Sequence, residues 1–175
     1  MAEHVEVLLS EEEVNARIKK MGEQISRDYA GKNIHLICIL KGGSFFMCEL
    51  AKRIAVPVSI DFMSLSSYGE STESAGKVKI VKDLEEPLEG RNVLVVEDIV
   101  DTGRTLSYLM ELLKDRGAAD VKLCTLLDKP DRRIVDINVN YIGFQIPDEF
   151  VVGYGLDYAQ RYRNLPYVGV VKFDS

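Results

Sequence analysis

The fold class is decided by one stretch of sequence, Asn92-Val93-Leu94-Val95-Val96-Glu97-Asp98-Ile99-Val100-Asp101-Thr102-Gly103-Arg104-Thr105. Residues 93–96 form an uninterrupted aliphatic run, which is typical of a strand buried on both faces in a parallel sheet. Beyond Thr105, apolar side chains recur at helical spacing until Gly117; they are Leu106, Leu109, Met110 and Leu113. A buried strand that passes directly into an amphipathic helix predicts a βαβ unit.

The same alternation of strand and helix patterns continues on both sides of this stretch. Short apolar runs predict strands at residues 34–40, 58–63 and 121–127, with weaker strands at 139–144 and 151–155. A capping box at Ser10-Glu11-Glu12-Glu13 predicts one helix, and a second is predicted at residues 45–54, before Pro57. We therefore expect an α/β fold with a central, twisted, mainly parallel β-sheet flanked by helices.

The length of 175 residues corresponds to about one domain. We expect a single domain over residues 1–175, with a core at about 10–130, a flexible lid at about 66–78 and a small hood from the loop-rich C-terminal part at about 130–175. The lid prediction rests on residues 66–76, in which Tyr68 is the only large apolar side chain. A plain surface hairpin is the alternative for this segment.

Composition and charge exclude several classes of protein. The chain is 46% hydrophobic, which excludes disorder, and it has no run of about 18 uncharged apolar residues that could span a membrane. Its net charge of −6 argues against a broad electrostatic grip on nucleic acid. The first residues are acidic, unlike a signal peptide. Three cysteines without a Cys-x-x-Cys pair indicate reduced thiols, so we expect a cytoplasmic protein.

Acidic and phosphate-binding features meet at the end of the central strand. Glu97, Asp98 and Asp101 fall at its carboxyl end, where open parallel sheets bind their ligands. The following residues, 102–105, open a helix whose N–H groups and positive terminus form an anion site, and Gly103 lets a phosphate approach the backbone. This combination indicates a ligand that carries a phosphate together with either a diol or bound Mg²⁺.

Each of these features also has an ordinary structural interpretation. The acidic turn could simply cap a helix, with Thr102 as the N-cap. Lys41 and Arg163 could be surface charges, and Phe150 could be a core residue. The run Lys129-Pro130-Asp131 could equally be a surface turn. Composition alone does not separate these alternatives from a binding site.

Longer motifs favour the functional interpretation. The run Val95-Val96-Glu97-Asp98-Ile99-Val100-Asp101-Thr102-Gly103-Arg104-Thr105 resembles the phosphoribosyl pyrophosphate signature of type I phosphoribosyltransferases. Further runs resemble the hypoxanthine-guanine branch of that family: Leu40-Lys41-Gly42-Gly43 its pyrophosphate loop, Ser67-Tyr68-Gly69 the start of its lid, Lys129 its purine-reading lysine, and residues 150–158 with Arg163 its base-stacking and metal-binding tail. The resemblance covers residues 34–163.

The resemblance implies a type I phosphoribosyltransferase-like fold and a Mg²⁺-dependent reaction. In this reaction 5-phosphoribose passes from 5-phosphoribosyl 1-pyrophosphate to hypoxanthine, guanine or both, giving IMP or GMP and pyrophosphate. Asp101 is implied as the general base that takes a proton from the purine imidazole. A non-proline cis peptide bond between Leu40 and Lys41 is also implied.

The implied contacts divide into four groups. Those to phosphoribose are Glu97, Asp98, Asp101, Thr102, Gly103, Arg104 and Thr105. Those to pyrophosphate are Lys41, Gly42, Arg163, Ser67 and Tyr68. Those to the purine are Lys129, Phe150, Val151 and Asp157. The candidate Mg²⁺ ligands are Asp157, Glu97 and Asp98. Because a lysine ammonium only donates hydrogen bonds, Lys129 favours a 6-oxo over a 6-amino purine.

Three alternatives of different kinds stay open. RNA-binding regulators of pyrimidine genes share this fold and signature, but Lys129 and the Phe150-Val151 run speak against that interpretation. A xanthine-preferring phosphoribosyltransferase is the second alternative, and a sugar-phosphate-binding module without turnover is the third. We expect small-molecule partners, no nucleic acid and no membrane, and the resemblance implies a homodimer or homotetramer.

Overall fold

The computed structural model describes residues 2–67 and 78–174. Its helices are α1 (Glu11–Asp28), α2 (Ser44–Lys52) and α3 (Arg104–Asp115), with a short 3₁₀ turn, η2 (Pro130–Arg132). Its strands are β1 (Glu3–Leu9), β2 (Ile34–Leu40), β3 (Val58–Ser67), β4 (Val78–Lys82), β5 (Asn92–Val100), β6 (Asp120–Asp128), β7 (Tyr141–Gln145), β8 (Val151–Val152) and β9 (Val168–Phe173). Most of the predicted lid, including Tyr68 and Gly69, lies outside the described residues.

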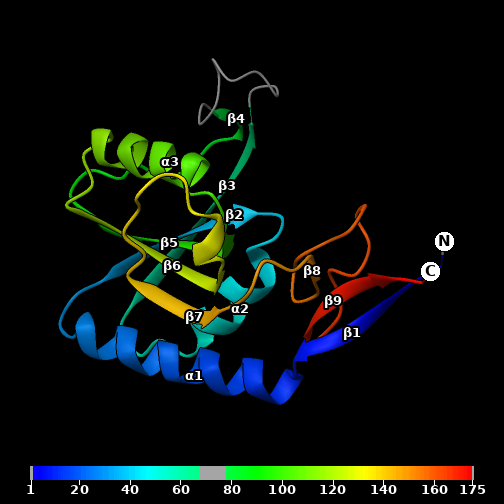
Figure 1. Cartoon of the computed structure of the whole chain (residues 1–175). Helices are drawn as coiled ribbons and strands as arrows, with labels where there is room; N and C mark the ends of the chain where they lie inside the picture. Colours follow the sequence, from blue (N-terminus) through cyan, green and yellow to red (C-terminus); the bar gives the residue numbers. More distant parts are fainter. Residues whose placement is uncertain (1, 68–77, 175) are drawn as a thin grey trace.

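The main sheet has six strands in the order β4-β3-β2-β5-β6-β7. All neighbouring pairs are parallel except β3 and β4, which pair antiparallel. Helices α1 and α2 cover one face of this sheet and α3 covers the other (Figure 1). The prediction of a mainly parallel sheet flanked by helices is confirmed.

The central strands are buried on both faces, as their uninterrupted aliphatic sequences predict. In β2, Leu36 and Cys38 pack on the side of α1 and α2, whereas Ile37 and Ile39 pack on the side of α3. Successive side chains of a strand point to opposite faces, so such a strand needs apolar residues at every position.

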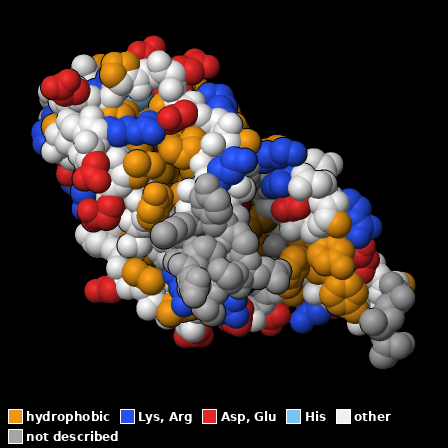
Figure 2. Space-filling view, turned by 90° about the horizontal axis from the view of Figure 1, so that it is seen from above, with side chains coloured by type: hydrophobic (Ala, Val, Ile, Leu, Met, Phe, Trp, Pro, Cys, Tyr) orange, Lys and Arg blue, Asp and Glu red, His pale blue; other side chains and the backbone are white. Residues whose placement is uncertain are grey.

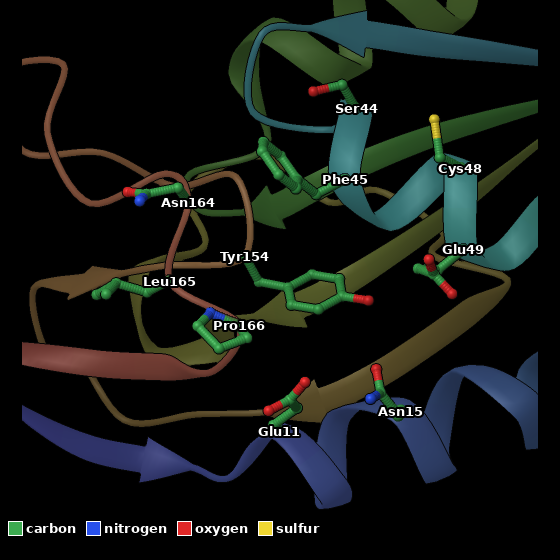
Figure 3. A pocket seen from close by; sticks show the side chains of 10 residues that line it. All are labelled: Glu11, Asn15, Ser44, Phe45, Cys48, Glu49, Tyr154, Asn164, Leu165 and Pro166. Carbon is green, nitrogen blue, oxygen red and sulfur yellow. The ribbon is translucent and has the colours of Figure 1, made fainter.

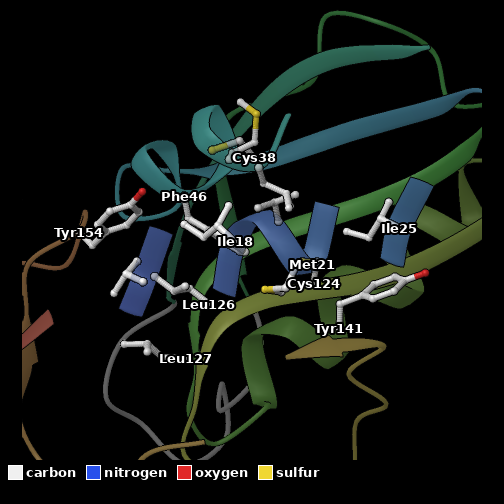
Figure 4. Packing of buried hydrophobic residues seen from close by; sticks show 14 of the residues in the cluster. Ile18, Met21, Ile25, Cys38, Phe46, Cys124, Leu126, Leu127, Tyr141 and Tyr154 are labelled. Carbon is white, nitrogen blue, oxygen red and sulfur yellow. The ribbon is translucent and has the colours of Figure 1, made fainter. Parts of the chain in front are cut away.

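Helix α1 begins at the predicted capping box, in which Ser10 Oγ accepts from the Glu13 N–H and the Glu13 carboxylate accepts from the Ser10 N–H. Its apolar stripe packs into the core (Figure 4); Ile18, Met21 and Ile25 lie there with Cys124 and Leu126 of β6 and Phe46 of α2. Full burial of each such aliphatic side chain contributes about 1.5–3 kcal/mol.

The hood differs from its prediction, because it is not made by the C-terminal part alone. It is a three-stranded sheet in the order β1-β9-β8, so the first strand of the chain pairs antiparallel with the last. Strand β7, which falls inside the segment predicted as hood, belongs to the main sheet instead. Both ends of the chain lie at the hood (Figure 1), where the Asp174 N–H donates to the Ala2 carbonyl at 2.9 Å.

Among residues 2–67 and 78–174, no helix is both long enough and apolar enough to cross a membrane.

Candidate active site

Three neighbouring strands of the main sheet carry the predicted site residues at their carboxyl ends. Lys41 and Gly42 follow β2, residues 101–105 follow β5, and Lys129 follows β6. Because β2, β5 and β6 are parallel and adjacent, these three groups meet at one edge of the sheet. Parallel topology therefore brings together residues that lie almost ninety positions apart in the chain.

The turn between β5 and α3 presents the start of a helix without a side-chain cap. Gly103 is the N-cap, with a left-handed φ of 87°, and no side chain caps the helix. The alternative in which Thr102 caps the helix is therefore wrong, although Thr102 Oγ1 accepts a long bond of 3.4 Å from the Arg104 N–H. A Cβ at Gly103 would also lie 2.9 Å from the Val135 carbonyl oxygen. The left-handed φ and this close approach both require glycine, and the open helix terminus favours an anion.

The neighbouring backbone holds this turn in place. The Thr102 carbonyl oxygen accepts from the N–H groups of Ile134 and Val135 at 3.0 and 3.2 Å. Arg104 and Thr105 are exposed in the first turn of α3. The turn is thus fixed by main-chain bonds, which leaves its exposed side available to a ligand.

Glu97 and Asp98 form a half-buried pair of carboxyl groups on β5. Burial raises the pKa of Glu97 well above its usual range, and the adjacent Asp98 charge and a hydrogen bond between the two side chains raise it further. Burial also raises the pKa of Asp98, against the opposing effect of hydrogen bonds from Glu97 and from the Ile99 N–H. Two such groups can both ionise only beside a cation or several hydrogen-bond donors.

The loop after β2 lies between this pair and the hood. Its Leu40–Lys41 peptide bond is cis, which confirms that part of the resemblance. A Cβ at Gly42 would overlap the Asp98 carboxylate, and a Cβ at Gly155 would overlap the Gly42 carbonyl oxygen. Glycine at both positions allows the main sheet, the loop and the hood to pack directly on one another.

Four side chains meet where the hood approaches this loop. Arg163 donates from Nη1 to the Gly155 carbonyl at 2.6 Å, and its Nη2 lies 3.4 Å from Asp157 Oδ1. The Gln160 side-chain oxygen accepts from Arg163 Nη2 at 3.3 Å and from Lys41 Nζ at 3.4 Å. Lys41, Asp157 and Arg163 are predicted site residues, whereas Gln160 is not, because no motif marks an amide in a polar loop.

A chain of ion pairs joins the predicted base to the predicted purine-reading lysine. The Asp101 Oδ1 atom accepts from Arg132 Nε at 3.0 Å, and Arg132 Nη1 lies 3.8 Å from Asp148 Oδ2. The other oxygen of Asp148 lies 3.7 Å from Lys129 Nζ. Lys129 is only 8% exposed, so it is not the surface-turn residue of the structural alternative. Sequence reasoning missed Arg132 and Asp148, which carry no motif.

Phe150 and Val151 stand at the inner end of the hood. Phe150 is 53% exposed, which contradicts a core role, and its ring packs edge-on against Tyr158 at 5.5 Å between centroids. Val151 is buried and pairs with Val170 in the hood sheet. About half of the Phe150 side chain is therefore accessible to a ligand.

The donor set fits a Mg²⁺ ion that takes most of its ligands from a substrate. Across the described ranges 2–67 and 78–174, no three His, Cys, Asp or Glu side chains gather into a metal-binding group. The raised pKa values of Glu97 and Asp98 mark a place where a cation would be stabilised. Mg²⁺ commonly uses one or two carboxylates together with water and phosphate oxygens, so the residues present fit it.

A hollow of the described residues lies outside this group of predicted site residues. A cavity of about 520 Å³ opens between α1, α2 and the hood, and its lining includes Phe45, Cys48, Glu49 and Tyr154 (Figure 3). None of the predicted substrate-binding residues lines it. On the face shown in Figure 2, outside the grey atoms, Lys and Arg side chains are interspersed with Asp and Glu, unlike the basic stripe of a nucleic-acid-binding surface.

Comparisons with known proteins agree with this geometry. The family model described as "Phosphoribosyl transferase domain" matches residues 4–159. The hypoxanthine-guanine phosphoribosyltransferase of Streptococcus thermophilus is 52% identical over 166 residues, covering 95% of this chain and 92% of the relative. A bifunctional TilS/HprT protein of Listeria monocytogenes is 55% identical over 166 residues, and the chain spans only 26% of its length.

Solved structures give the same result. A crystal structure of a hypoxanthine phosphoribosyltransferase from Staphylococcus aureus superposes with a TM-score of 0.92 at 52% identity, covering 95% of this chain and 91% of that one. A hypoxanthine-guanine phosphoribosyltransferase from Bacillus anthracis, with HEPES in its active site, gives a TM-score of 0.91 at 48% identity, covering 94% of this chain and 97% of that one.

Proposed function

The chain belongs to the phosphoribosyltransferase family, in its hypoxanthine-guanine branch, and from this premise we propose that it transfers 5-phosphoribose from 5-phosphoribosyl 1-pyrophosphate to hypoxanthine or guanine. The products are IMP or GMP and pyrophosphate. One observation carries the proposal: an uncapped helix start, a half-buried carboxylate pair and a buried lysine meet at one edge of the sheet.

The phosphoribose part of the donor fits the β5–α3 turn. The N–H groups of Gly103 and Thr105, the Arg104 N–H now in a long bond to Thr102 Oγ1, and the hydroxyls of Thr102 and Thr105 can donate to the 5-phosphate. Glu97 and Asp98 can accept from the ribose hydroxyls, which are donors that a buried carboxylate needs. The raised pKa values of this pair support a role that begins only when donors or a cation arrive.

Asp101 would act on the purine as the general base. As one imidazole nitrogen bonds to the anomeric carbon, the bond from that carbon to the pyrophosphate oxygen breaks with its electron pair, and the Asp101 carboxylate would take the proton from the other nitrogen. A positioned base of this kind contributes about 10²–10⁴-fold to turnover. Arg132 bonds only the Oδ1 atom of Asp101, and the second oxygen of a carboxylate can accept from the purine.

Lys129 and the hood would select the base. The buried ammonium of Lys129 can donate to a 6-oxo group, whereas the 6-amino group of adenine would bring two donors together. An unpaired buried donor costs about 1–3 kcal/mol, which corresponds to roughly 5–150-fold discrimination against adenine. Phe150 can stack on the purine, and the Val151 backbone can bind its edge.

The pyrophosphate would lie between the loop after β2 and the hood. Lys41, Gly42 and Arg163 supply cationic and backbone donors there, with Asp157, Glu97 and Asp98 as the candidate Mg²⁺ ligands. When bound, Mg²⁺ neutralises the charge that develops on the departing pyrophosphate. The backbone of Ser67 ends β3 beside this region, and the proposed closing role of Tyr68 concerns a residue outside the described ranges.

The protein is proposed to be a homodimer or homotetramer in the cytoplasm. Large apolar side chains are exposed on α2 and β3, namely Phe45, Val58 and Ile60, as expected of a homodimer or homotetramer. The three cysteines are free thiols, which supports a cytoplasmic location.

A product assay tests the proposed function. The purified protein is incubated with 5-phosphoribosyl 1-pyrophosphate, Mg²⁺ and one base at a time: hypoxanthine, guanine, xanthine, adenine or uracil. We expect IMP and GMP and little AMP. Turnover of xanthine alone would favour the xanthine-preferring alternative, and donor binding without any nucleotide would favour a binding module. Absent turnover with tight RNA binding would favour the regulator of pyrimidine genes.

A further inference from the structure

We propose that Gln160 is a positioning residue of the pyrophosphate site, holding Lys41 and Arg163 together until the pyrophosphate replaces it. This inference rests on the proposed function. Its basis is one shared atom: the Gln160 side-chain oxygen accepts from Lys41 Nζ at 3.4 Å and from Arg163 Nη2 at 3.3 Å. The two cations come from opposite sides of the site, one from the loop after β2 and one from the hood.

The chemistry of an amide suits this role. Two cations that share a site repel each other, so an acceptor between them is needed to keep both in place without a ligand. A neutral amide oxygen supplies that acceptor and adds no negative charge to the one that Asp157 already places beside Arg163. A carboxylate at the same place would form two ion pairs and would compete directly with the pyrophosphate.

The backbone fixes Gln160 at the tip of a closed turn. The Tyr158 and Arg161 main chains bond each other in both directions, at 3.0 and 2.9 Å. Gln160 has a left-handed φ of 67°, and its N–H donates to Asp157 Oδ2 at 2.9 Å. The same residue therefore also orients Asp157, the candidate Mg²⁺ ligand in the hood.

Two substitutions test the inference, Gln160→Glu and Gln160→Ala, with Gln24→Glu as the matched control. Gln24 is exposed on α1, so it receives the same change of charge away from the site. The measurements are the calorimetric Kd for pyrophosphate with Mg²⁺, the KM for the phosphoribosyl donor and the KM for hypoxanthine.

We expect Gln160→Glu to weaken pyrophosphate binding and to raise the donor KM by about tenfold, with kcat and the hypoxanthine KM little changed. The difference should shrink between about 0.05 and 0.5 M salt, because exposed ion pairs are screened. Gln160→Ala should raise the donor KM about threefold, and this increase should not depend on salt. Gln24→Glu should change neither the pyrophosphate Kd nor the donor KM.

The outcomes separate this inference from the proposed function. Both Gln160 variants binding pyrophosphate as the wild type does would overturn the inference, even if nucleotide forms normally. Weaker binding in Gln160→Glu without nucleotide formation by the wild type would support the inference and overturn the proposed function. A wild type that binds no pyrophosphate would overturn both. Should Gln160→Glu fail to fold, the pyrophosphate Kd of Gln160→Ala decides the question by itself.

Discussion

The β5–α3 turn and the hood loop at residues 154–163 both line the proposed site, but they are held in place differently. The turn is continuous in sequence, follows a strand paired on both sides, and is fixed by main-chain bonds to residues 134–135. The loop is closed by main-chain bonds within the hood, but it reaches the main sheet through contacts such as that with Lys41, and it belongs to a small sheet that pairs β1 with β9. The turn therefore forms from residues that are close in sequence, whereas the hood loop depends on pairing between strands that are far apart in sequence.

The largest expected effect lies on the turn. Asp101→Asn keeps the shape of the side chain but removes its basicity, so kcat should fall by at least about a hundredfold while the donor Kd changes little. Steady-state kinetics and calorimetric donor binding measure the two quantities. Near-normal turnover would exclude Asp101 as the base and would leave the turn as a binding element only.

A second substitution tests the dependence of the hood on long-range pairing. A Cβ at Gly169 would overlap Val5 and lie 3.0 Å from the Glu6 carbonyl oxygen, so Gly169→Ala should separate β1 from β9. Such overpacking costs about 1–3 kcal/mol. We expect donor and purine KM values to rise at least threefold, because the hood carries Phe150 and Arg163.

The control for this substitution is Gly31→Ala, at the end of α1. Its φ of 78° makes alanine costly there, but no atom lies within 4 Å of the added Cβ. Both variants should lower Tm, and only Gly169→Ala should raise the KM values. Equal KM changes in the two variants would contradict a special role of hood pairing.

A third substitution tests whether the end of β5, which leads into the turn, sacrifices stability for function. Glu97→Gln removes a carboxyl group whose pKa is raised by burial and by Asp98, so the ligand-free protein should become more stable. Each kcal/mol gained raises Tm by about 2–4 °C for a chain of this size. Turnover should fall by about tenfold or more, since bonds from the ribose hydroxyls to a charged acceptor are lost.

Thermal unfolding without ligand measures the first effect of this substitution, and steady-state kinetics measures the second. Glu85→Gln is the control, because Glu85 is exposed. A lower Tm for Glu97→Gln, with the Tm of Glu85→Gln unchanged, would show that the carboxyl pair stabilises the fold. It would contradict the idea that the end of β5 gives up stability for function.

The smallest effect lies at the opposite end of the sheet, outside both regions. Burial, followed by the Arg91 charge, lowers the pKa of His35, which is 2% exposed and lies 2.7 Å from Ser59 Oγ. The unfolded chain therefore binds a proton at a higher pH than the folded one. The free energy of unfolding should be unaffected above the ordinary pKa of about 6.5 and should fall as the pH drops below it.

Urea unfolding at pH 7.5 and 5.5 measures this decline, and His35→Gln should make it shallower. Identical declines in the wild type and the variant would show that His35 does not contribute. Activity at pH 7.5 should be the same in both proteins, because His35 lies at the amino end of β2, away from the site.

Sequence reasoning succeeded where structure is local. Residues 93–96 specify a strand buried on both faces, and Gly103 specifies a turn that a Cβ would obstruct. It failed where structure depends on distant pairing. Strand β1 offers only a short alternation of valines and charged residues, and its burial depends on β9 at the other end of the chain.

The same distinction holds within the site. The motif residues Asp101 and Lys129 follow strands that the sequence predicts, so their meeting could be expected. Gln160, Arg132 and Asp148 act through contacts between segments, and their residue types are common on any surface. Only the folded chain shows that an amide, a guanidinium and a carboxylate complete the connections between predicted residues.

The pairing of β1 with β9 has a consequence for the order in which a newly made chain acquires its parts. Synthesis from the amino end produces the β5–α3 turn at residues 101–105 well before residues 168–173 of β9. Until β9 is made, neither β1 nor β8, the strand that follows Phe150, has its pairing partner. A chain that lacks residues 168–173 would thus keep every strand of the main sheet but lose the partner of β1, so the hood side of the proposed site depends on a later segment than the β5–α3 turn does.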